Sequence, residues 1–155
     1  MIKIRKGVFE TNSSSVHTLV LSKNGMEPNK MKVRKRKKED GTFGKYIIGS
    51  LGSFDKDTRD YTTQEEKLSY LLTICYLTDG REDLDWMRES WEFCELENMI
   101  KEYCNVDGLL IDKKTEELAY IDHQSRYNYD SLSDFQMDYK EFIFNSYISL
   151  HTTCD

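Results

Sequence analysis

The stretch Thr63-Gln64-Glu65-Glu66-Lys67-Leu68-Ser69-Tyr70-Leu71-Leu72-Thr73-Ile74-Cys75-Tyr76 carries the clearest helix signal in the chain. Thr63 and Glu66 match a capping box, in which the threonine hydroxyl and the glutamate carboxylate satisfy backbone donors at a helix start. Apolar side chains then recur at helical spacing in one stripe, which consists of Leu68, Leu71, Leu72, Cys75 and Tyr76. We therefore predict a helix that packs this single stripe against the rest of the protein, with Cys75 pointing inward.

Upstream of this helix, the chain is predicted to be mostly β. Ile2–Arg5, Val16–Leu21 and Tyr46–Ile48 are short apolar runs rich in β-branched residues, which is typical of strands. Between the first two runs, Asn and Ser side chains can bond their own backbone, which favours a tight polar loop over residues 9–15.

Downstream, the pattern predicts a second helix over Glu82–Tyr103 that is apolar on two sides. One stripe is predicted to contain Trp86, Phe93, Leu96, Ile100 and Tyr103, and the other Leu84, Met87, Trp91 and Cys94. The remaining predicted elements are a hairpin of Leu109–Ile111 with Leu118–Asp122, a helix from near Ser131 or Ser133, and a strand at Tyr147–Leu150. This order predicts an α+β fold in one domain over 1–155, a mostly antiparallel sheet with about three helices packed on it.

Length and hydropathy limit the classes to which the protein can belong. The chain has 155 residues, of which 38% are hydrophobic, and this is enough for one folded domain. No apolar run approaches the ~18 residues of a membrane span, and the charged N-terminus lacks the apolar core of a signal peptide. We therefore expect a cytoplasmic protein without membrane contact, whose cysteines are thiols or metal ligands.

The charge is distributed unevenly. Residues 1–40 contain eleven Lys and Arg against four Asp and Glu, although the whole chain has a net charge of −6. Seven of the basic residues lie in Lys30–Lys38, and we predict a basic loop at 28–40 that is free to be mobile. This run could bind nucleic acid, but it contains no aromatic residue for stacking. The acidic remainder argues against duplex DNA as the main partner and suits a basic protein.

Three residues are of the types that zinc prefers. His17 and His123 are predicted at strand ends, and Cys75 faces inward from the first helix. We predict that His17, Cys75 and His123 bind a structural zinc ion, with Cys94, Cys154, His151 or water as the fourth ligand. The alternatives are a histidine satisfied by hydrogen bonds and a buried, unliganded cysteine.

A hydrolase is a further alternative. One of Ser13, Ser14 and Ser15 could act as a nucleophile, with His17 or His123 as the base and Asp122 orienting it. The chain contains no Gly-x-Ser-x-Gly, Walker or Rossmann motif, so we expect a protein that is not an enzyme.

Three sequence blocks resemble a family of small proteins of phages, prophages and Gram-positive bacteria. They are Arg5-Lys6-Gly7-Val8-Phe9-Glu10-Thr11-Asn12-Ser13-Ser14-Ser15-Val16-His17, Tyr120-Ile121-Asp122-His123-Gln124-Ser125 and Phe142-Ile143-Phe144-Asn145. Within that group, the chain resembles the type II-A anti-CRISPR proteins, inhibitors of the single-chain RNA-guided Cas nuclease. The resemblance implies a zinc-containing binding protein of the host cytosol, in which His17 and His123 are family positions. It would bind the nuclease and block target DNA binding or loading, without binding nucleic acid directly.

Overall fold

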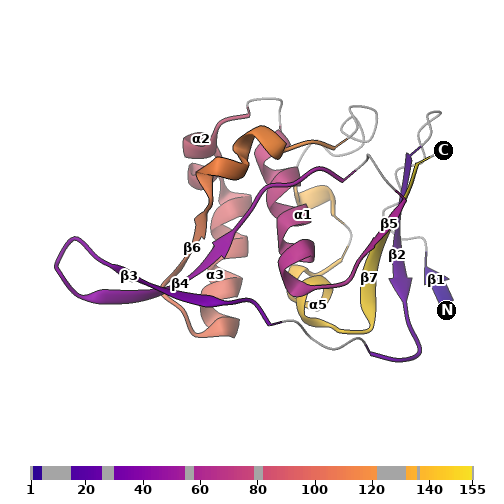
Figure 1. The fold of residues 1–155 in the computed structure, drawn as a ribbon, viewed down its shortest axis with the longest axis horizontal. Coiled ribbons are helices and arrows are strands. Elements are labelled where there is room, and N and C mark those ends of the chain that lie inside the picture. Colours follow the sequence, from indigo (N-terminus) through magenta and orange to yellow (C-terminus); the bar gives the residue numbers. More distant parts are fainter. Residues whose placement is uncertain are drawn as a thin grey trace.

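The computed structural model describes residues 2–4, 15–25, 30–54, 58–78, 82–121, 132–135 and 137–154. They form the predicted α+β fold, but with two small sheets in place of one, and helices packed against them (Figure 1). None of the described helices is long and apolar enough to cross a membrane.

The first sheet, sheet A, is antiparallel and has the strand order β1-β2-β7-β5. Its strands are β1 (Ile2–Ile4), β2 (Ser15–Leu21), β5 (Arg59–Tyr61) and β7 (Ile148–Cys154). The predicted strands at both ends of the chain are therefore confirmed, and they pair with each other through β2 and β7.

The second sheet, sheet B, has the order β3-β4-β6. Strand β3 (Val33–Lys37) runs antiparallel to β4 (Phe43–Gly49), and the two extend away from the helices (Figure 1). The prediction of a basic loop is wrong over these residues, because β3 pairs with β4 along one edge while all five of its side chains remain in water. A lysine-rich edge strand of this kind also resists pairing with other chains.

The third strand of sheet B corrects the predicted hairpin. Strand β6 (Gly108–Ile111) pairs in parallel with β4 and does not turn back on the following residues. The Asp112 side chain accepts a hydrogen bond from the Lys114 backbone and starts the 3-10 helix η2 (Lys113–Leu118). Beyond it, Tyr120 forms an isolated parallel bridge with Ser53.

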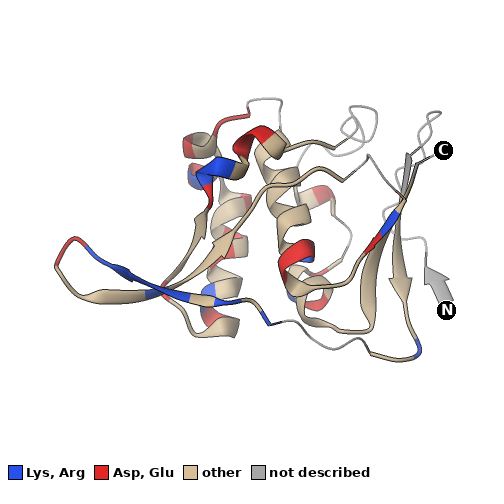
Figure 2. Cartoon of the chain, in the orientation of Figure 1, with Lys and Arg blue, Asp and Glu red and all other residues tan. Residues whose placement is uncertain are grey.

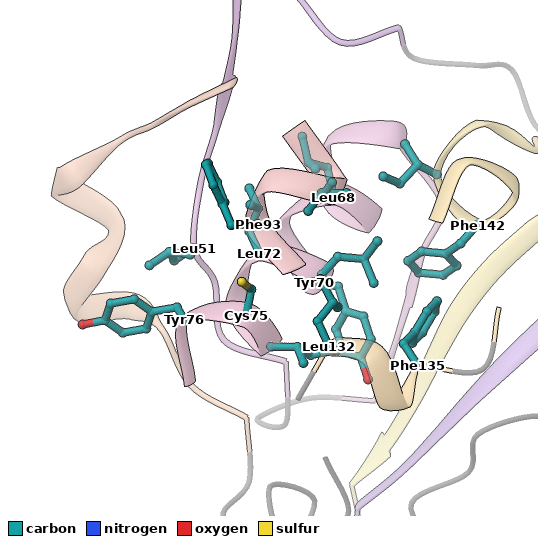
Figure 3. Packing of buried hydrophobic residues seen from close by; sticks show 14 of the residues in the cluster. Leu51, Leu68, Tyr70, Leu72, Cys75, Tyr76, Phe93, Leu132, Phe135 and Phe142 are labelled. Atoms are coloured by element: carbon teal, nitrogen blue, oxygen red, sulfur yellow. The ribbon is translucent and has the colours of Figure 1, made fainter. Parts of the chain in front are cut away.

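Helix α1 (Gln64–Leu77) lies between the two sheets (Figure 1). Its predicted capping box is confirmed, since the Thr63 hydroxyl accepts from Glu66 N at 3.1 Å and the Glu66 carboxylate accepts from Thr63 N at 3.1 Å. The prediction of a single apolar stripe is wrong, because every residue from Lys67 to Leu77 is buried. Contacts with β4, α2, α3, α5 and η3 surround the helix and form one core (Figure 3).

The predicted helix over residues 82–103 is two helices, α2 (Leu84–Glu89) and α3 (Trp91–Cys104). Ser90 separates them, and its hydroxyl accepts from Phe93 N at 3.3 Å to cap α3. The change of axis turns Trp91 and Cys94 towards solvent, so the second predicted stripe is right only for Leu84 and Met87. The C-terminal elements are η3 (Leu132–Asp134) and α5 (Tyr139–Phe144), which begins later than predicted because Asp138 is its cap.

Candidate functional site

His17, one of the predicted metal ligands, is buried on β2. Its Nδ1 shares a hydrogen bond of 2.8 Å with the Tyr70 hydroxyl of α1, and the two rings meet edge to face at 5.6 Å. Tyr70 in turn contacts Phe54, Phe135 and Phe142. His17 is thus held by the aromatic core between sheet A and α1.

Cys75 points into the core, as predicted (Figure 3). Burial raises the pKa of its thiol to about 12, and its Sγ lies 3.7 Å from the Ser90 hydroxyl. Cys75 lies five positions after Tyr70 in the sequence, and this offset corresponds to a rotation of roughly 140° around a helix. Cys75 therefore faces a different side of α1 from the partner of His17.

His123 lies outside the described residues, together with Ser13, Ser14 and Asp122 of the hydrolase alternative. Among the described residues, no three His, Cys, Asp or Glu side chains form a group that could hold a metal ion. Of the fourth-ligand candidates, His151 bonds Asp60 at 2.6 Å, Cys94 is exposed, and the side chain of Cys154 lies outside the description. The zinc site of His17, Cys75 and His123 stays a prediction, which elemental analysis of the purified protein tests.

A hollow of about 720 Å³ lies along sheet B; it includes the face opposite the buried side of the sheet and is also lined by Glu65 and Leu68 of α1. Strand periodicity puts Arg34 and Arg36 on this face, with Ile48 and Leu110 as a half-buried apolar floor. We call this hollow the basic groove, and its cationic lining consists of Lys32, Arg34, Arg36, Arg88, Lys113 and Lys114. These cations come from the β3 region, α2 and η2, and Figure 2 shows them on β3 and η2.

Few acids oppose these cations. Glu65 and Asp112 are the acidic lining residues, and Asp112 is engaged as the cap of η2. Arg88 lies 4.0 Å from Asp85, at the limit of an ion pair. Within the described part of the chain, Lys32, Arg34 and Arg36 have no ion pair. The groove therefore presents uncompensated positive charge.

Asp107 connects the β3–β4 hairpin, near its turn, to the start of β6. Its carboxylate accepts from the Lys45 backbone at 2.8 Å and from the Lys38 ammonium at 3.1 Å. Two hydrogen bonds lower the pKa of Asp107, and the one from the Lys45 backbone has a larger effect than the one from Lys38. The hydrogen bond to Asp107 in turn raises the pKa of Lys38. These contacts keep the basic strand in a defined position beside the body.

A second surface carries acids. Glu89 of α2 and Glu95 of α3 are exposed, and Trp91, 61% exposed, lies at the start of α3. Trp91 and Glu95 line a hollow of about 420 Å³ with Asp138 and the aromatic side chains of Phe135 and Tyr139. We call this surface the acidic face.

The groove was only partly predictable. The alternation of Lys32, Arg34 and Arg36 is a strand signal that the density of charge obscures. Nothing local indicates that Arg88 and the two lysines of η2 join them. Comparisons with family models, with curated proteins and with solved structures find no match for this chain.

Proposed function

We propose that the protein binds nucleic acid through the basic groove. The observation that carries the proposal is the convergence of six cationic side chains from three separate elements on one hollow with two acids. Phosphate contacts by Lys and Arg supply most of the affinity of such sites, and the planar guanidinium of Arg suits phosphate oxygens especially well.

The net charge of −6 does not oppose this proposal strongly. Physiological salt screens exposed charges beyond about 8 Å, so the local charge of the groove decides whether an anion binds. The sequence alone favours a protein partner, because it predicts a loop without an aromatic neighbour. The pairing of Arg34 with Tyr46 across β3 and β4 removes that objection.

The test is fluorescence anisotropy of a labelled oligonucleotide of about 20 bases, titrated with protein between about 50 and 200 mM salt. The combined variant Lys32→Ala, Arg34→Ala, Arg36→Ala should lower the slope of log affinity against log salt by about 2 to 3. The matched control is Lys35→Ala with Lys37→Ala, which removes charge from the opposite face of the same strand. Unchanged binding in the triple variant, or no binding by the wild type at low salt, contradicts the proposal.

The inhibitor implied by the family resemblance is a second candidate, in which the protein binds a type II-A Cas nuclease and blocks its target DNA loading. The acidic face favours it, because an exposed tryptophan beside carboxylates suits a basic protein surface. Inhibition should then scale with stoichiometry, and Glu89→Lys with Glu95→Lys should weaken it. A nuclease that remains fully active with excess protein rules this candidate out.

A further inference from the structure

Tyr46 of β4 lies across two glycines on the same face of sheet B as Arg34, Arg36 and Ile48. These three residues line the basic groove, and Tyr46 lies next to the groove without lining it. A Cβ atom at Gly44 would come within 2.6 Å of Lys38 Cε, 2.7 Å of Tyr46 Cε2 and 2.8 Å of the Tyr46 hydroxyl oxygen. At Gly108, the register partner of Tyr46 on β6, a Cβ would lie 3.1 Å from Glu97 Oε1 and 3.4 Å from Tyr46 Cδ1 and Cε1. Opposite edges of the ring therefore approach the two backbones, so the ring lies along the sheet surface.

Two arginines flank this ring. Arg34 is the register partner of Tyr46, and Arg36 is the register partner of Gly44, which the ring covers. Directly opposed residues of an antiparallel pair have Cβ atoms about 5 Å apart on the same face. The half-buried Tyr46 and Arg34 are thus neighbours on one face of the sheet, and neither Arg34 nor Arg36 has an ion pair within the described residues.

We infer that the basic groove and the adjoining face of sheet B bind single-stranded nucleic acid, with one base stacked on Tyr46 and neighbouring phosphates bound by Arg34 and Arg36. The inference rests on the proposed function and narrows it. Bases of a single strand can leave their neighbours and stack on an aromatic side chain, whereas bases inside a duplex present only their edges. The apolar floor of Ile48 and Leu110 extends the surface on which a base can lie.

The test compares four labelled ligands: single-stranded DNA, single-stranded RNA, duplex DNA of equal length, and polyphosphate, which has charge but no bases. Tyr46→Leu should weaken binding of a single strand by about 5- to 100-fold and leave polyphosphate binding unchanged. Tyr46→Phe should retain the affinity because it keeps the ring. The matched control is Phe43→Leu, which removes a ring that is 70% exposed on the opposite face of β4.

Gly44→Ala gives a second variant that keeps Tyr46, and it should weaken the same ligands because its Cβ crowds the Tyr46 ring as well as the Lys38 side chain. Equal losses on polyphosphate and single strands, or full retention of single-strand binding in Tyr46→Leu, overturn the stacking inference. A different result contradicts the proposed function itself: the triple variant of Lys32, Arg34 and Arg36 binds polyphosphate as tightly as the wild type does. A preference for RNA or DNA in the wild type identifies the natural strand.

Discussion

The polar side chains around sheet A and those of β3 in sheet B differ in whether they have bonding partners. Around sheet A, His17 bonds Tyr70, the Lys67 ammonium donates to the carbonyls of Asn145 and Ile148, and His151 bonds Asp60. On sheet B, all five residues of β3 are exposed, and its two arginines have no ion pair among the described residues.

This difference separates stability from binding. Buried polar groups require partners, so the bonds of the buried His17 and Lys67 are expected to stabilise the fold, whereas the exposed His151–Asp60 pair contributes less. Exposed charges without partners contribute little to folding and remain available for a ligand. Substitutions at sheet A should therefore change the free energy of unfolding, whereas those at sheet B should change affinity.

The largest contrast is expected between two tyrosines. Tyr70→Ala removes a fully buried ring with four aromatic neighbours and should lower the free energy of unfolding by about 3 to 5 kcal/mol. Tyr46→Ala removes a half-buried ring on sheet B and should cost no more than about 1 kcal/mol. Urea denaturation monitored by circular dichroism measures both, and equal losses would show that the two sheets do not differ in this way.

The second prediction concerns pH. Burial lowers the pKa of Lys67 to about 8, whereas in the unfolded chain it is near 10.5. Between these values the unfolded state holds a proton that the folded state has lost, so rising pH favours folding by up to about 1.4 kcal/mol per unit. The stability of the wild type relative to Lys67→Met should therefore rise from about pH 8 towards pH 10.

Urea denaturation across this pH range measures the difference between the two proteins. The control is Lys35→Met on exposed β3, which should change the free energy of unfolding at pH 7 by less than about 0.5 kcal/mol. Parallel stability profiles for the wild type and Lys67→Met would mean that Lys67 stays charged in the folded protein.

The smallest expected effect on folding is at the groove itself. Arg34→Ala and Arg36→Ala should each change the free energy of unfolding by less than about 0.5 kcal/mol, because both side chains are exposed. The same two proteins should bind oligonucleotides more weakly in the anisotropy assay. A loss of stability as large as that of Tyr70→Ala would assign these arginines a structural role.

Local signals predicted several elements correctly. The capping box of Thr63 and Glu66 starts α1, and apolar β-branched runs form β2 and β7. Two of the errors occurred where a short polar side chain changed the direction of the chain. Ser90 divides the helix predicted over 82–103, and Asp112 starts η2 in place of a hairpin turn.

The candidate site was harder to predict than the elements. The inward position of Cys75 follows from helix periodicity and is confirmed, but periodicity does not specify which partner a side chain meets. His17 is held by Tyr70, which is 53 residues away, and no pattern in the sequence connects the two. The sequence also does not predict β3, because a run with seven basic residues in nine is more typical of a solvated loop than of a strand.

By itself, the sequence determined the α+β class, the start of α1 and the alternation of Lys32, Arg34 and Arg36, because these depend on neighbouring residues and backbone periodicity. Only the tertiary structure decided that β4 pairs in parallel with β6, which brings Gly108 under Tyr46 and places η2 and β3 on the same hollow. Such pairings depend on which apolar faces bury each other across the whole chain. The basic groove exists only once sheet B and the helices have packed, since its cations come from segments far apart in sequence.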